Sequence, residues 1–206
     1  MKYEDWEPVY LEICEYFSFD PVQDEQAAQV AASLSATNSI DTLFQKIAGK
    51  HVTVCGNAPC LSDQIEGISG VIIAADAASA VLLKSGVKPD IIVTDLDGID
   101  DYATRLNESG TIMVVHAHGD NIPRLKTWIP RLPGPMVMTT QGRPFDHLHN
   151  FGGFSDGDRA VYMAQECGAL SITLIGFDCD DPTVTPIKQG KLIWARRLLA
   201  DIGYEC

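Results

Sequence analysis

From residue 50 onward, short runs of apolar residues alternate with longer stretches in which apolar and polar residues are mixed. Each run is nearly continuous in hydrophobic residues, which is typical of strands that are buried on both faces of a sheet. We expect six strands, at residues 51–55, 71–74, 91–94, 112–115, 136–139 and 172–175. The intervening segments long enough for a helical crossover are 76–86, 98–109, 119–129 and 156–168. Strands that alternate with helices predict a mostly parallel sheet with helices on both faces.

The first 48 residues have a different pattern, which predicts helices only. Asp20 followed by Pro21 is typical of a helix start, and the Ala-rich segment 22–35 continues that helix. A further short helix is expected over residues 40–48, before Gly49. We therefore divide the chain into an N-terminal helical segment, 1–48, and an α/β domain, 49–206. The predicted fold class is α/β, with a Rossmann-like sheet of about six strands.

The composition adds a strong negative charge to this picture. The chain of 206 residues has 28 acidic and 15 basic residues, a formal net charge of −13. This balance disfavours nucleic acid as the main partner, because its phosphate backbone would be repelled. No stretch approaches the ~20 apolar residues of a membrane span, and the N-terminus lacks the pattern of a secretory signal. We expect a cytoplasmic protein that acts on small molecules, with a homo-oligomer as an option.

The six cysteines include no C-x-x-C pair, which disfavours a structural zinc site. Four of them lie in or beside apolar runs, where cysteine behaves as a small hydrophobic residue. We therefore expect all six to be reduced.

Polar residues collect where the predicted strands end. Ligands bind outside the carboxyl ends of the strands in open α/β sheets, so these residues predict the site. Asp95 and Asp97 are two residues apart on an extended segment and therefore point the same way. They can share a hard cation, with Asp120 from the next strand end completing the set, and Mg²⁺ combines such carboxylates with substrate phosphate. This favours metal-assisted phosphoryl chemistry, although D-x-D motifs also serve glycosyltransferases that use nucleotide sugars.

Two histidines, His116 and His118, also share one face of a strand end. Without a third soft ligand, we favour phosphate contact or hydrogen bonding over metal ligation. His147 and His149 have the same ambiguity, and we interpret the long irregular segment 141–155 as a mobile loop over the site.

Two glycine-containing turns are candidates for binding a nucleotide. Gly56 and Asn57 follow the first strand in a turn that is expected to feed a helix N-terminus, a generic anion site. The second turn, 152–159, opens a helix. Ser155 and Asp156 there fit either a helix cap or a phosphate contact, and Arg159 lies one turn further on.

Taken together, these segments resemble the archaeal 6-hydroxymethyl-7,8-dihydropterin diphosphokinases, the MptE-like family. The matching segments are 54–61, 74–76, 88–98, 116–121, 150–160 and 174–178. The resemblance implies a fold similar to the thiamin pyrophosphokinase catalytic domain. It also implies transfer of a diphosphate from ATP to the hydroxymethyl oxygen of the pterin, with release of AMP, in the biosynthesis of tetrahydromethanopterin or folate-type cofactors. The first turn departs from the family, because Ala58 and Cys60 stand where a glycine and a serine are usual.

The resemblance and the strand-end chemistry together assign a role to each candidate residue. The expected Mg²⁺ ligands are Asp95, Asp97 and Asp120. The expected nucleotide contacts are Gly56, Asn57, Asp76, Ser155 and Asp156. We expect His116 to accept the hydroxymethyl proton and Arg159 or His118 to stabilise the charge on the transferred group. Asp178 or Asp76 is the candidate for recognising the pterin edge.

Other functions remain open at this point. A glycosyltransferase-like enzyme that uses a nucleotide-activated sugar has similar G-N-x-P and D-x-D patterns, but those proteins are much longer. A thiamin-type diphosphokinase is a further alternative. A non-catalytic nucleotide-binding module would have fewer acids at its strand ends.

Overall fold

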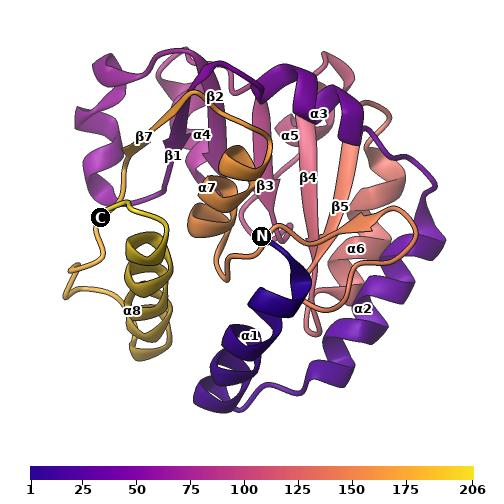
Figure 1. The fold of residues 1–206 in the computed structure, drawn as a ribbon. Helices are drawn as coiled ribbons and strands as arrows, with labels where there is room; N and C mark the ends of the chain where they lie inside the picture. The colour runs from indigo at the N-terminus through magenta and orange to yellow at the C-terminus, as the bar shows by residue number, and fades with distance from the viewer.

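The structure, a computed structural model, describes residues 1–206. Its centre is a seven-stranded sheet in the order β6-β5-β4-β3-β2-β1-β7, in which all neighbouring strands are parallel (Figure 1). The strands are β1 (His51–Cys55), β2 (Val71–Ala75), β3 (Ile91–Thr94), β4 (Ile112–Ala117), β5 (Met136–Thr140), β6 (Leu148–His149) and β7 (Ser171–Ile175). The predicted α/β fold with a parallel sheet is confirmed.

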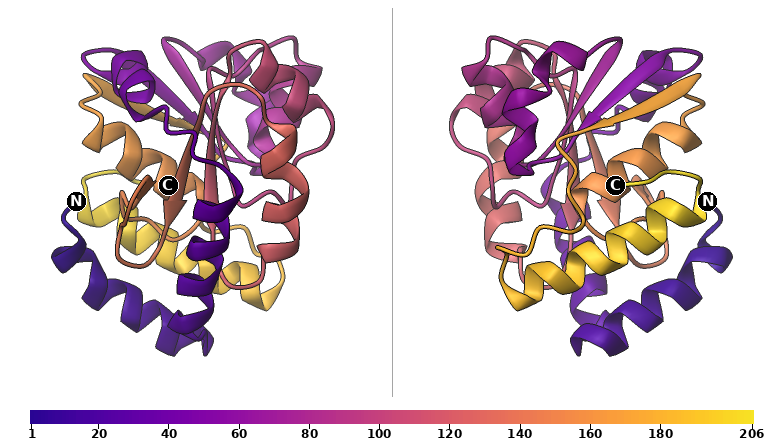
Figure 2. Two further views of the ribbon diagram at one scale, coloured as in Figure 1. Left: turned by 90° about the vertical axis from the view of Figure 1, so that its right-hand side faces the viewer. Right: turned by 90° about the vertical axis from the view of Figure 1, so that its left-hand side faces the viewer.

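Helices cover both faces of the sheet (Figure 2). They are α1 (Tyr3–Phe17), α2 (Pro21–Leu34), α3 (Ile40–Ile47), α4 (Ala78–Lys84), α5 (Tyr102–Glu108), α6 (Ile122–Trp128), α7 (Asp156–Glu166) and α8 (Pro186–Asp201). One core packs α2, α4, α5 and α6 against the sheet, and the other packs α3, α7 and the end of α8 against its opposite face. Successive strand residues point to opposite faces, so Ile92 belongs to the first core while Ile91 and Val93 belong to the second.

The helical prediction for the N-terminal segment is confirmed. The side chain of Asp20 accepts a hydrogen bond from the backbone of Val22 at 3.0 Å and caps α2, as expected. The buried alanines of α2 share the core of the strands. Helix α1 packs against α7 and α8 through a separate cluster that includes Trp6, Tyr10 and Trp194.

The structure differs from the predicted element order in three places. The sheet has seven strands instead of six, because β6 forms within the segment 141–155. A strand of two residues is too short to produce a recognisable hydrophobic pattern. No α-helix follows β1, and the chain instead forms two short 3₁₀ turns, Pro59–Asp63 and Ile65–Gly67. The C-terminal helix α8 was not among the predicted crossovers.

The expectation that all six cysteines are reduced is wrong for one pair. Cys179 and Cys206 form a disulfide across a sequence separation of 27 residues, while the other four cysteines are free. The bond joins the segment before α8 to the end of the chain after it, and cysteine spacing alone does not reveal such a pairing. None of the helices combines the length and the apolar character that a membrane crossing requires.

Candidate active site

A cavity of about 640 Å³ lies at the carboxyl edge of the sheet. The corner between α1 and α2, the start of α7 and one side of α8 form its other walls. Helices α1 and α8 lie at the lower edge of the molecule in Figure 1. The cavity brings together every residue that the sequence analysis assigned to catalysis, nucleotide contact or metal binding. These residues are Gly56, Asn57, Asp76, Asp95, Asp97, His116, His118, Asp120, Ser155, Asp156 and Arg159. Their roles stay predictions, but their convergence on one cavity is a property of the fold.

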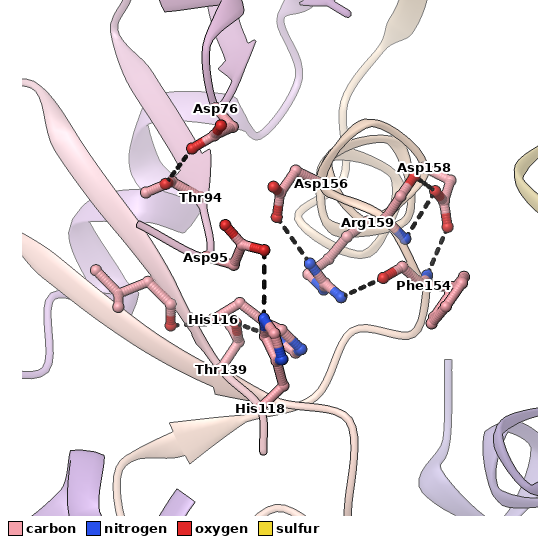
Figure 3. Close-up of polar contacts among 12 residues, drawn as sticks. Asp76, Thr94, Asp95, His116, His118, Thr139, Phe154, Asp156, Asp158 and Arg159 are labelled. Carbon is pink, nitrogen blue, oxygen red and sulfur yellow. Dashed lines mark hydrogen bonds and ion pairs between the residues drawn. The ribbon is translucent and has the colours of Figure 1, made fainter. Parts of the chain in front are cut away.

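Three carboxylates form the centre of the site. Asp76 follows β2, Asp95 follows β3, and Asp156 is the first residue of α7. Each offers an oxygen within 4.8 Å of the other two, and Figure 3 shows the three side chains close together, each with its own hydrogen-bond partner. Asp97 lines the cavity outside this cluster, and the side chain of Asp120 is 86% exposed. The closest carboxylates are therefore Asp76, Asp95 and Asp156, and not the predicted set of Asp95, Asp97 and Asp120.

The backbone positions Asp76 tightly. Its φ of 47° lies in the left-handed region, and its Oδ1 accepts a 2.5 Å hydrogen bond from Thr94 Oγ1. Gly98 makes room for it, since a Cβ at that position would lie 1.8 Å from Asp76 Oδ2. Burial, together with repulsion from Asp95 and Asp97, raises the pKa of Asp76 to about 6. The site thus holds more negative charge than its own residues neutralise.

Asp95 lies beside the imidazole ring of His118. Nε2 of His118 lies 3.2 Å from Asp95 Oδ2, and its Nδ1 lies 2.6 Å from Asp120 Oδ1. Both ring nitrogens of His118 therefore face carboxylate oxygens. Burial opposes ionisation of Asp95, but the hydrogen bond and the charge of His118 outweigh it and hold the pKa of Asp95 well below its usual range. Asp120 therefore contacts the edge of the site through His118.

Asp156 is paired with Arg159, one turn along α7. Arg159 Nη1 lies 2.9 Å from Asp156 Oδ1, and its Nη2 donates to the carbonyl of Phe154 at 2.7 Å (Figure 3). Burial raises the pKa of Asp156 well above its usual value, and the charge of Arg159 only partly offsets this effect. Arg159 is 3% exposed, so its guanidinium is held in a fixed position at the cavity wall.

His116 is the most deeply buried polar group of the site, with 1% of its surface exposed. Its Nδ1 lies 3.0 Å from Thr139 Oγ1, which in turn donates to the carbonyl of Val115 at 3.3 Å. Nδ1 must therefore be the donor, which leaves Nε2 as an acceptor, and that atom has no partner in the protein. Burial and the charge of Arg159 lower the pKa of His116 well below its usual value, so the ring is neutral.

Two predicted nucleotide contacts also have structural roles. Gly56 lies where the ends of β1 and β7 approach each other, and a Cβ there would be 2.5 Å from the carbonyl oxygen of Gly176. Ser155 is the N-cap of α7, and its hydroxyl donates to the carboxylate of Asp158, which also accepts from the backbone N–H groups of Phe154 and Ser155. The first turn leads into a 3₁₀ turn, so the predicted α-helix N-terminus after Gly56 and Asn57 is absent.

The segment 141–155 contributes less to the site than expected. His147 faces the carbonyl of Ser35 at 2.7 Å and His149 faces the side chain of Asn38 at 3.2 Å, and neither histidine lines the cavity. Only the two ends of the segment reach the cavity, through Gln141 and through Phe154 with Ser155.

The sequence analysis missed an entire wall of the site. Helix α8 lines the cavity with Lys188, Lys191, Leu192 and Ala195, and the α1–α2 corner contributes the segment 18–20. Helix α8 follows the last strand, and its pattern of apolar residues does not indicate that it lies beside the strand ends. An amphipathic segment that presents two lysines three residues apart was the only available signal.

The fold and the cavity together define a Rossmann-like α/β protein with an acidic ligand site at the carboxyl edge of its sheet. The chain belongs to the family described as 6-hydroxymethylpterin diphosphokinase MptE-like, whose sequence pattern matches residues 25–183.

Curated relatives agree with this membership. The chain is 39% identical to the 6-hydroxymethyl-7,8-dihydropterin pyrophosphokinase of Pyrococcus furiosus, over 97% of this chain and 93% of that protein. It is 35% identical to the protein of the same name from Methanothermobacter thermautotrophicus, over 97% of this chain and 94% of that protein. The solved structure of the MAf glycosyltransferase from Magnetospirillum magneticum AMB-1 is 18% identical, with a TM-score of 0.45 over 76% of this chain and 29% of that one. A similarity of that size carries no argument about function.

Proposed function

We propose that this protein transfers a diphosphate from ATP to the hydroxymethyl group of 6-hydroxymethyl-7,8-dihydropterin and releases AMP. The names of the curated relatives and the family membership support this reaction. The observation that carries the proposal is the group of three carboxylates, Asp76, Asp95 and Asp156, within 4.8 Å at the carboxyl edge of the sheet. A polyanionic co-substrate can bind beside these acids only if cations neutralise both.

The donor set fits Mg²⁺. All three side chains offer the hard oxygen ligands that this ion prefers, and each has an oxygen within 4.8 Å of the other two, so the three could hold one ion together. When bound, Mg²⁺ would neutralise charge on the phosphates and orient them. Burial first, and then the charges of Asp95 and Asp97, raise the pKa of Asp76, and a cation bound beside these acids would offset both effects.

The remaining residues fit complementary roles in diphosphate transfer. His116 Nε2 is a neutral acceptor without a partner, which suits acceptance of the hydroxymethyl proton as the oxygen attacks. Arg159 places a fixed positive charge beside the acids, and His118 lies 3.2 Å from Asp95, so both are positioned to stabilise charge on the transferred group. Transfer of this kind depends mainly on positioning and charge neutralisation, which a rigid cavity edge supplies.

We also propose that the protein acts in the cytoplasm, in the biosynthesis of a tetrahydromethanopterin or folate-type cofactor. The need for ATP supports that location, and the formal net charge of −13 supports small molecules over nucleic acid as partners.

Incubation with ATP, Mg²⁺ and a panel of acceptors tests the reaction directly. The panel holds 6-hydroxymethyl-7,8-dihydropterin, thiamin and a simple sugar, and release of AMP is followed by chromatography. We expect AMP only with the pterin, in a 1:1 ratio to the pterin diphosphate formed. AMP with thiamin alone, or no AMP with any acceptor, would contradict the proposal.

A further inference from the structure

Helix α8 brings two free lysines to the cavity. Lys188 and Lys191 are three residues apart, which places them on one face of the helix, and both line the cavity with Leu192 and Ala195 from the same side of α8. Neither ammonium group forms an ion pair or a hydrogen bond in the protein. Lys188 is exposed and Lys191 is partly buried.

These lysines differ from every other cation at the site. The only other Lys or Arg side chain lining the cavity is Arg159, which is already bound to Asp156 and to the carbonyl of Phe154. Asp178 and Asp181 line the same side of the cavity, yet neither neutralises the lysines. The two ammonium groups are therefore the positive charge that remains available to a ligand.

The position of α8 is fixed relative to the cavity. The Cys179–Cys206 disulfide joins the segments that precede and follow the helix, and Thr185 caps its first turn by accepting from the backbone of Lys188. Trp194, Leu198 and Leu199 bury the C-terminal half of the helix against α1 and α7. The helix that carries Lys188 and Lys191 is thus an anchored wall of the cavity that both lysines line.

We propose that Lys188 and Lys191 bind the phosphate chain of the nucleotide, on the wall of the cavity that α8 forms. This inference rests on the proposed function for the identity of the nucleotide. The carboxylates hold the phosphates only through a cation, whereas the lysines contact phosphate oxygens directly as flexible point charges. In a chain with a net charge of −13, these contacts offset the general repulsion of a triphosphate.

The test compares two double variants with the same change in net charge. Lys188→Gln/Lys191→Gln removes the proposed contacts. Lys84→Gln/Lys126→Gln removes two exposed, unpaired lysines on α4 and α6 that do not line the cavity. Binding of ATP, AMP and inorganic tripolyphosphate to each protein is measured by calorimetry with Mg²⁺ and without acceptor. Circular dichroism verifies that each variant is folded.

We expect the α8 double variant to bind ATP and tripolyphosphate about 10- to 100-fold more weakly than the wild type, because each contact is made by a partly solvated lysine and is weaker than a buried charge pair. Its affinity for AMP should change less than threefold, and the α4/α6 variant should bind all three ligands normally. Lys188→Arg/Lys191→Arg should restore most of the ATP affinity. Three results would overturn the inference: an equal loss of affinity for ATP and AMP in the α8 variant, an equal loss of ATP affinity in the α4/α6 variant, or unchanged ATP affinity in the α8 variant.

The same experiment separates this inference from the proposed reaction. A wild-type protein that binds ATP through these lysines but releases no AMP with the pterin would contradict the reaction alone. Normal transfer to the pterin, with ATP affinity unaffected in the α8 variant, would contradict the lysine assignment alone.

Discussion

Asp76 is a carboxylate whose ionised form is destabilised by its surroundings. Burial and the neighbouring acids raise its pKa to about 6, so the ionised side chain opposes folding at neutral pH. This loss of folding stability is complete above pH 6. It disappears as the pH falls toward the pKa of the unfolded state, near 4, because the folded state takes up the proton first. A carboxylate kept at such a cost is typical of a functional site.

Asp76→Asn should therefore stabilise the protein without ligand by about 1–2 kcal/mol at pH 7, and by almost nothing at pH 4. Asparagine tolerates the left-handed backbone of this position and can still accept the hydrogen bond from Thr94. Urea unfolding of both proteins at the two pH values measures the effect. An Asp76→Asn protein that is less stable than the wild type at pH 7 would contradict this account of the site's electrostatics.

His116 should give the opposite dependence on pH. It is neutral and buried in the folded protein but takes up a proton below about pH 6.5 once the chain unfolds, so its contribution to stability is lost as the pH falls. Between pH 6.5 and 5, the wild type should lose up to about 2 kcal/mol more than His116→Asn, at about 1.4 kcal/mol per pH unit. Denaturant unfolding across this range measures the difference. Parallel curves for the two proteins would show that folding does not shift the pKa of His116 and would contradict its neutral, buried state.

At the scale of elements, the disulfide around α8 makes the clearest prediction. Cys206→Ser opens a loop closed over a separation of 27 residues, and loop-closure entropy then predicts a loss of about 3 kcal/mol. For a chain of this size the melting temperature should fall by roughly 6–12 °C. Cys60→Ser, which alters a free and partly exposed thiol, is the matched control and should change little. Calorimetric melting that is equal in the two variants would contradict the pairing.

The elements that the sequence predicted are those whose physics is local. Four-to-six-residue apolar strands buried on both faces, such as β3 and β4, leave a continuous hydrophobic run, and Asp20 with Pro21 marks a helix start. Strand β6 and the disulfide depend on contacts made only in three dimensions, so neither has a local signature. Helix α8 was missed for a related reason. Its apolar residues pack against α1 and α7, so it is not a crossover helix that lies on the sheet between two strands.

The site was predictable in part for the same reason. Parallel strands place their carboxyl ends together, so residues that follow each strand converge whatever the details of packing. Which carboxylates come closest depends on backbone conformation at single residues. The left-handed backbone at Asp76 and the absence of a side chain at Gly98 allow the Asp76 carboxylate to lie near Asp95. The side chain of Asp120 instead points outward and contacts His118. Neither feature follows from spacing along the chain.

At the scale of the whole molecule, the excess of acids should make the protein respond strongly to a divalent cation. Mg²⁺ bound to the folded state would relieve repulsion among Asp76, Asp95 and Asp156. At a Mg²⁺ concentration 100 times the dissociation constant, this binding would raise the free energy of unfolding by about 2.7 kcal/mol. We expect the melting temperature to rise with MgCl₂ and to return after EDTA. NaCl at matched ionic strength should give a clearly smaller rise, and an equal rise would indicate general screening in place of a specific site.

The central claim, that the carboxylate group of Asp76, Asp95 and Asp156 supports diphosphate transfer, is tested most directly by one comparison of turnover. AMP release from ATP with the hydroxymethylpterin is measured at saturating Mg²⁺ for the wild type, Asp95→Asn and Asp120→Asn. Asp95 lies within the group, while Asp120 is exposed and reaches it only through His118. We predict that kcat falls about 10²- to 10³-fold in folded Asp95→Asn, the scale seen when one preorganised electrostatic contact is removed, and less than threefold in Asp120→Asn. Near-normal turnover by Asp95→Asn, or an equal loss in both variants, would contradict the claim.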